Sequence, residues 1–70
     1  MLVAITFDES TIWGAGEDKW DALEDARQWD DEVALKTMPC SDELYDVVRG
    51  AFYQSHKIVD GVAYLHDEAV

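Results

Sequence analysis

Apolar and polar residues alternate at the start of the chain. Residues 2–7 have the period of two that is typical of a half-buried β-strand. One face of this strand carries Val3, Ile5 and Phe7. Residues 8–10, Asp-Glu-Ser, indicate a turn, and residues 11–13 predict the returning strand of a hairpin. Gly14-Ala15-Gly16 is then expected to break this strand and to open a helix.

Residues 17–32 have the spacing of an amphipathic helix. At about 100° per residue, its apolar side chains fall in one half of the helical wheel. They are Trp20, Ala22, Leu23, Ala26, Trp29 and Val33. Trp20 and Trp29 are therefore expected in the core. Trp13 and Tyr53 are also read as core residues, with exposed anchors for a partner as the alternative.

The second half of the chain predicts a strand, a helix and a hairpin. Residues 33–38 predict a strand closed by Pro39, and Ser41 is a good N-cap for a second helix. The buried face of that helix is expected to consist of Leu44, Val47, Val48, Ala51 and Phe52. Gly50 lies inside the helix or ends it. Asp60-Gly61 predicts the turn of a hairpin between residues 57–59 and 62–65, and residues 66–70 are expected to fray.

The predicted order of elements is ββαβαββ within one domain, residues 1–70. Two amphipathic helices on one face of a small antiparallel sheet would bury both apolar stripes. The predicted fold class is therefore α+β.

The composition limits the classes of function. The 70 residues carry a net charge of −11, which disfavours direct binding to nucleic acid or to an anionic membrane and favours a basic partner. Hydrophobic residues make up 49% of the chain, too many for a disordered acidic tail. A single cysteine and the lack of a long apolar run predict a soluble protein of the reducing cytoplasm.

The acidic residues are concentrated in the first half of the chain. Residues 1–32 contain ten acids and two bases, hence a net charge of −8, whereas residues 33–70 have six acids and three bases, hence −3. The polar half of the first predicted helix carries Glu17, Asp18, Asp21, Glu24, Asp25, Asp31 and Glu32. Like charges four residues apart, and acids at the C-terminal end of a helix, each destabilise the helix. A binding role would explain their retention.

The spacing of these carboxylates indicates what they would imitate. A helix over residues 17–32 spans about 22 Å, so seven carboxylates give roughly one charge every 3–4 Å, close to the ~3.4 Å between charges along one DNA strand. The sequence thus predicts a DNA-like row of negative charge. The alternative is an ordinary solvated surface that aids solubility.

Other candidate sites are less specific. Cys40 could be a nucleophile with His56 or His66 as its base, but a half-buried structural cysteine is the simpler interpretation. Residues 66–68, His-Asp-Glu, form a weak metal motif, and residues 30–32 lack the pattern of a calcium loop. Gly14-Ala15-Gly16 lacks the remaining residues of a phosphate-binding loop. We therefore expect no catalytic residues, no metal and no cofactor.

Two resemblances follow from these features. The run from Val3 through Trp13-Gly14-Ala15-Gly16 to Ala22-Leu23-Glu24-Asp25-Ala26 resembles the first half of HicB-type antitoxins, over less than half of the chain. In size, charge and one-sided acidic face, the whole chain resembles small anti-CRISPR proteins and anti-restriction DNA mimics. That resemblance implies a phage-type inhibitor that occupies the DNA-binding channel of a host nuclease or CRISPR effector.

We therefore predict a non-catalytic, DNA-mimicking inhibitor, with an antitoxin-like protein-interaction module as the alternative. The alternative would use a sheet edge or exposed aromatic side chains. The residues expected to face basic side chains of the partner are Glu17, Asp21, Glu24, Asp25, Asp31 and Glu32, with Asp8, Glu9 and Asp30 at the rim.

Overall fold

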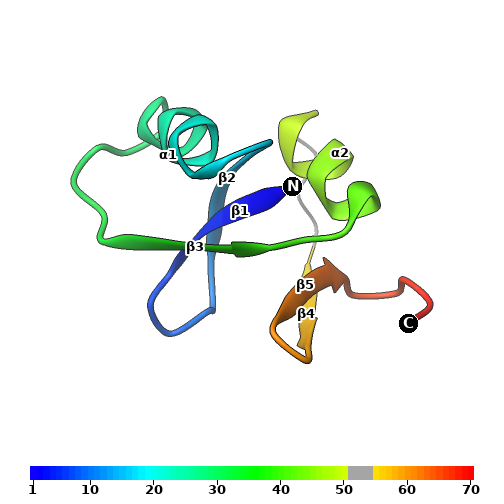
Figure 1. The fold of residues 1–70 in the computed structure, drawn as a ribbon. Helices are drawn as coiled ribbons and strands as arrows, with labels where there is room; N and C mark the ends of the chain where they lie inside the picture. Colours follow the sequence, from blue (N-terminus) through cyan, green and yellow to red (C-terminus); the bar gives the residue numbers. More distant parts are fainter. Residues whose placement is uncertain (51–54) are drawn as a thin grey trace.

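The computed structural model describes residues 1–50 and 55–70, in which the chain forms five strands and two helices (Figure 1). In chain order they are β1 (Leu2–Thr6), β2 (Ile12–Gly16), α1 (Lys19–Arg27), β3 (Leu35–Pro39), α2 (Asp42–Arg49), β4 (His56–Val59) and β5 (Val62–Leu65). The fold class, α+β, and the order ββαβαββ are as the sequence predicts.

The strands form two antiparallel sheets. The first has the order β2-β1-β3, and the second is the hairpin β4-β5. Pairing between β1 and β2 shifts by one residue between Ala4 and Ile5, so that Trp13 has no partner across the ladder. The two sheets are joined through Ala63 of β5, which forms a parallel bridge with Cys40 and accepts a hydrogen bond from the Ser41 N–H (2.9 Å).

The three-stranded sheet is covered on both faces. One face packs with Leu44 of α2 and with β4–β5 in a core cluster consisting of Val3, Ile5, Ile12, Ala15, Met38, Cys40, Leu44 and Ala63. The other face packs against α1 in a smaller cluster consisting of Ala4, Ala22 and Ala26, flanked by Leu2, Trp13, Leu23 and Leu35. The helices therefore contribute to opposite faces, whereas the sequence predicted both on one face. Alternation along β1 allows this, because its residues point to the two faces in turn.

The turn and cap signals are confirmed. Asp60 and Gly61 both have positive φ, 52° and 78°, as a two-residue hairpin turn requires. The Ser41 hydroxyl accepts a hydrogen bond from the Leu44 N–H at the start of α2 (3.2 Å), and Gly50 is the C-cap. Ala51 and Phe52, expected on the buried face of α2, and Tyr53, a possible anchor, lie outside the described residues.

The end of the chain is held more firmly than its sequence indicates. Glu68 Oε1 accepts hydrogen bonds from the Ser41 hydroxyl (2.7 Å) and from the Leu65 N–H (3.1 Å). Lys57 donates to the Glu68 carbonyl oxygen. The expected fraying is thus wrong up to Glu68, because side chains from three parts of the chain meet there. None of the helices in the described part of the chain has the length and apolar character needed to cross a membrane.

Candidate protein-interaction surface

Helix α1 lies unusually close to strand β2. A Cβ atom built on Gly14 would come within 2.5 Å of the Ala26 nitrogen, and one on Gly16 within 2.3 Å of the Ala22 nitrogen. Ala22 and Ala26 are themselves fully buried. Glycines within a strand commonly mark such a close approach of another backbone. Gly14-Ala15-Gly16 is therefore part of β2, and the expectation that it breaks the strand is wrong.

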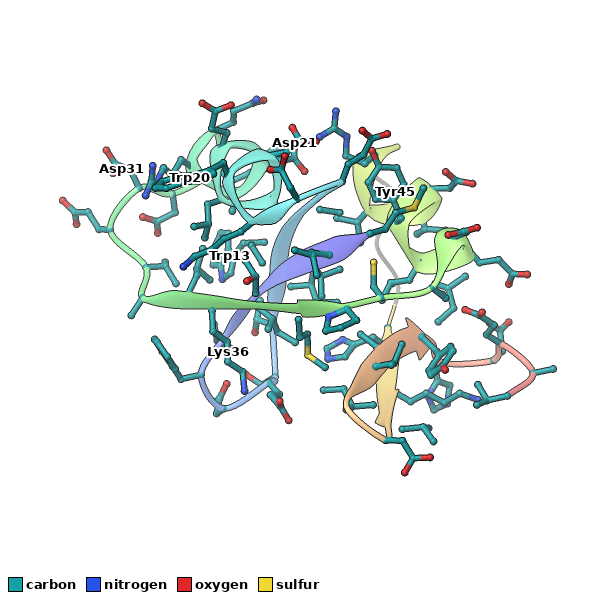
Figure 2. The ribbon with its side chains drawn as sticks, in the orientation of Figure 1. Trp13, Trp20, Asp21, Asp31, Lys36 and Tyr45 are labelled. Carbon is teal, nitrogen blue, oxygen red and sulfur yellow. The ribbon has the colours of Figure 1, made fainter. Side chains whose placement is uncertain are left out.

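This close contact decides which side of α1 faces solvent. Only small residues fit between the helix and the sheet, so Ala22 and Ala26 occupy the buried side and larger side chains lie outside. Trp20 is 70% exposed and Trp29 is 69% exposed. The expectation that both tryptophans belong to the core is therefore wrong. In Figure 2, Trp20 lies on the side of α1 turned away from α2.

The helix is also shorter than its sequence pattern predicts. It begins after the N-cap Asp18 and ends at Arg27 instead of extending over residues 17–32. The Asp30 carboxylate accepts a hydrogen bond from the Glu32 N–H (2.9 Å), which favours a turn in place of further helix. Asp31 and Glu32 are exposed in this segment between α1 and β3. The nine-residue helix spans only about 13–14 Å, so the predicted single helical row of carboxylates is wrong.

Several carboxylates from the polar half of the predicted helix hold the fold together, including Asp21 and Asp25 of the predicted binding residues. Asp18 Oδ1 accepts the Asp21 N–H (2.9 Å), and Asp21 Oδ2 accepts the Glu17 N–H (3.1 Å). Asp25 Oδ2 accepts the Ala15 N–H (3.0 Å) from β2. Asp21 and Asp25 are accordingly only partly exposed. Each of the two has an internal role that the helical wheel did not reveal.

Arg49 of α2 completes the contact on the same edge strand. Its Nη1 donates to the Ala15 carbonyl oxygen (3.1 Å) and lies 3.6 Å from Asp21 Oδ1. The outward N–H and C=O groups of Ala15 are thus both satisfied, one by Asp25 and one by Arg49. Covering an edge in this way hinders the addition of a further strand at this point.

Asp8 and Glu9, predicted at the rim, lie at the turn between β1 and β2. Asp8 Oδ1 accepts hydrogen bonds from the Thr6 hydroxyl (2.6 Å), the Ser10 hydroxyl (2.7 Å) and the Ser10 N–H (3.0 Å). These bonds, that from Thr6 foremost, lower the pKa of Asp8 to about 2. Glu9 forms an ion pair with Lys36 of β3 (2.8 Å). Both side chains stabilise the hairpin, whose turn lies at the end of the sheet away from α1 (Figure 1).

Residues 17–32 expose acidic and aromatic side chains, beside which Asp18, Lys19, Arg27 and Gln28 are also exposed. Six of these exposed residues are called the α1 face here: Glu17, Trp20, Glu24, Trp29, Asp31 and Glu32. Glu24 lies about 180° round the helix from the buried alanines and one turn from Trp20. Figure 2 shows Trp20 and Asp31 on the same side of the molecule. Residues 17–32 contain eight acids and two bases, hence a net charge of −6.

The carboxylates of the α1 face are not neutralised by ion pairs in the described part of the chain. Within residues 1–50 and 55–70 the two ion pairs are Lys36–Glu9 and Arg49–Asp21. Lys19 and Arg27 are the basic residues of the segment, and both are exposed. The surface therefore remains able to attract cationic groups.

The exposure of the tryptophans is the feature that sequence reasoning missed. The helical wheel ranked side chains by hydrophobicity and placed the two largest on the buried side. A usable signal was present in the pairs Gly14/Gly16 and Ala22/Ala26, whose spacing puts small residues on one side of a strand and of a helix. Trp13 does pack in the smaller core cluster, and its buried Nε1 has no hydrogen-bond partner within the described residues.

The remaining candidate sites have structural explanations. Cys40 is buried in the larger core cluster, and this burial raises the pKa of its thiol to about 11. The thiol is therefore protonated at neutral pH, unlike a nucleophilic cysteine. His56 Nε2 lies 2.9 Å from the Glu9 carbonyl oxygen and thus links β4 to the first hairpin. In residues 1–50 and 55–70, no three His, Cys, Asp or Glu side chains gather to hold a metal ion.

Comparison with protein families, curated proteins and solved structures finds no match for this chain. Its function is therefore inferred from the α1 face.

Proposed function

We propose that this protein is a non-catalytic cytoplasmic inhibitor that binds a basic, nucleic-acid-binding protein through the α1 face. The observation that carries this proposal is the combination of two tryptophans, each about 70% exposed, with four exposed carboxylates on one short segment. Exposed aromatic residues are enriched at protein interfaces, and acidic surfaces select basic partners. By occupying such a partner, the protein would keep nucleic acid from it.

The charge of the whole chain supports a partner of this kind. At −11, the molecule is repelled by nucleic acid and attracted to the positive surfaces that nucleic-acid-binding proteins present. A CRISPR effector or a nuclease has such a surface. The carboxylates that imitate phosphates come from α1 and from the following segment together, because the helix alone is too short to supply the row.

A second candidate is a protein-interaction module of the antitoxin type, in which aromatic contacts dominate. The exposed Trp20 and Trp29 favour it, because burial of a large aromatic side chain contributes to binding without requiring a charged partner. Use of the β2 edge is not favoured, since Asp25 and Arg49 satisfy the outward groups of Ala15.

A pair of charge variants distinguishes the two candidates. The first neutralises the exposed carboxylates of the α1 face: Glu17→Gln, Glu24→Gln, Asp31→Asn and Glu32→Gln. The matched control neutralises four exposed acids elsewhere: Glu43→Gln, Asp46→Asn, Asp60→Asn and Asp67→Asn. Both variants change the net charge from −11 to −7, so they differ only in location. Asp21 and Asp25 are left unchanged because they bond to the backbone.

Each protein is immobilised, incubated with cell lysate at low and high salt, and eluted with duplex DNA. The proposal predicts that the wild type and the control capture nucleic-acid-binding proteins that DNA or high salt releases, and that the α1-face variant loses about 90% of this capture. If the α1-face variant, folded by circular dichroism, captures the same DNA-eluted proteins as the control, the proposal is wrong. Capture of a partner that resists both salt and DNA would support the antitoxin-type candidate.

A further inference from the structure

We propose that Trp20 and Trp29 are the contacts by which this protein selects arginine side chains of its partner over lysine side chains. This inference rests on the proposed function, because it specifies the partner chemistry at the same α1 face. It concerns the two aromatic rings, however, and not the carboxylates that attract the partner.

The rings of Trp20 and Trp29 are exposed to solvent. Trp20 and Trp29 leave about 70% of their surface in water, although this small domain has a core of mostly small and aliphatic side chains. Aromatic side chains are enriched at protein interfaces relative to the rest of the surface. The fold does not need these rings at their positions, because Ala22 and Ala26 make the contact between α1 and the sheet.

Within residues 1–50 and 55–70, no cationic side chain lies over the face of either tryptophan ring. In the part of the chain that the structure describes, the one cation placed over an aromatic ring is Arg49, 5.9 Å from the centre of the Tyr45 ring. This pair lies on α2. Trp20 and Trp29 therefore remain available to a cation from outside.

The charge and the aromatic rings of the α1 face favour an arginine side chain as its ligand. A second copy of this chain also carries −11 and is repelled from the α1 face, as is any nucleic acid or anionic lipid surface. Arginine combines a planar guanidinium that stacks on tryptophan with a fork of donors that matches a carboxylate. Glu24, one helical turn from Trp20, supplies a carboxylate beside that ring. Lysine fits this pairing less well because its ammonium group is compact and strongly hydrated.

The test measures the affinity of the protein for nona-arginine and nona-lysine peptides at about 0.15 M salt. The wild type is compared with a Trp20→Leu/Trp29→Leu variant, which keeps apolar side chains but removes the rings. Phe7→Leu is the matched control, because Phe7 is a 65% exposed aromatic residue in the turn between β1 and β2. Circular dichroism verifies that each variant is folded.

We expect the wild type and Phe7→Leu to bind nona-arginine at least about fourfold more tightly than nona-lysine. In the double variant, nona-arginine affinity falls by about two- to fivefold for each ring, and the ratio approaches one. Equal affinities for the two peptides in the wild type, or an unchanged ratio in the double variant, overturn the inference.

The same measurements separate this inference from the proposed function. If both peptides bind the wild type with equal affinity, and the neutralised α1-face variant loses both, the acidic surface is retained as the binding site and only the role of the tryptophans is wrong. If neither peptide binds the wild type, or if the α1-face variant binds as the wild type does, the proposed function itself is contradicted and the inference with it.

Discussion

The carboxylate of Asp8 closes the turn between β1 and β2 by accepting three hydrogen bonds at one oxygen. Two come from hydroxyl groups, of Thr6 and Ser10, and the third comes from the Ser10 N–H. Each bond is stronger to the ionised carboxylate than to the neutral acid, so together they lower the pKa of Asp8 to about 2. An acid predicted to contact a partner is thus engaged within the fold.

The lowered pKa makes the turn sensitive to pH in a defined range. Because the pKa is lower in the folded chain than its ordinary value of 3.8, the stabilising contribution of Asp8 is complete above about pH 4 and is lost as the pH falls towards 2. In urea unfolding between pH 2 and pH 6, wild type should therefore exceed Asp8→Asn in stability by a margin that narrows below pH 4.

A Thr6→Val variant serves as the control, since it removes the strongest of the three bonds. NMR titration of the Asp8 carboxyl carbon should then show a midpoint that rises from about 2 towards 3.8. A midpoint near 3.8 in the wild type, or a margin over Asp8→Asn that does not change with pH, would contradict this account of the turn.

Among the elements, the contact between α1 and β2 has the strictest geometry. A helix normally packs through side chains that separate it from the sheet, but here the glycines of β2 allow the backbone of α1 to touch the strand. The helix is only nine residues long, too short to be stable alone, so its structure depends on this contact. The Asp25 bond to Ala15 fixes its rotation about its own axis.

Replacing Gly16 by alanine should separate α1 from β2. The new Cβ would lie 2.3 Å from the Ala22 nitrogen and 2.5 Å from the Asp21 carbonyl carbon, which are backbone atoms that cannot rotate away. We expect the free energy of unfolding to fall by about 3 kcal/mol, at the upper end of ordinary overpacking. Urea denaturation monitored by tryptophan fluorescence measures this loss.

Gly50→Ala is the matched control for this substitution. Gly50 has a φ of −81°, which any residue adopts, and a Cβ added there would have the Asp46 carbonyl oxygen as its nearest neighbour, at 3.1 Å. The free energy of unfolding of the Gly50→Ala variant should differ from that of the wild type by less than about 1 kcal/mol in either direction. Equal effects of the two substitutions would show that the close contact between α1 and β2 is not required.

At the scale of the whole molecule, the excess of negative charge opposes folding. Sixteen acids and five bases share a domain with extents of 32 × 23 × 20 Å. In dilute buffer of about 0.01 M ionic strength, the screening length of about 30 Å lets charges repel one another across the molecule. The unpaired carboxylates of the α1 face therefore lower the stability of the protein.

Salt should relieve this repulsion. Raising the NaCl concentration from about 0.01 M to 0.5 M is expected to increase the Tm by roughly 5 °C, which corresponds to about 1 kcal/mol in a domain of this size. Thermal unfolding followed by circular dichroism measures the increase. The variant with four neutral residues on the α1 face should gain less, because less repulsion remains to be screened. A Tm that falls with added NaCl would be the opposite of this prediction.

The order of elements follows from the sequence, because its signals are local. The alternation in residues 2–7, the cap at Ser41 and the turn at Asp60-Gly61 each depend on a few neighbouring residues, and the structure contains the corresponding strand, helix start and hairpin. The acidity of the first half of the chain is likewise a property of the sequence alone.

The composition of the α1 face was decided only by the tertiary structure. A helical wheel shows which side chains are large and apolar, but not how near the helix comes to its neighbour. Where Gly14 and Gly16 let the backbones touch, the buried positions go to Ala22 and Ala26, and Trp20 and Trp29 remain in solvent. Likewise, the Asp25 carboxylate accepts a hydrogen bond from the N–H of Ala15 in β2, ten residues earlier in the chain. Such distances between segments are set by packing, which the pattern of any one segment does not show.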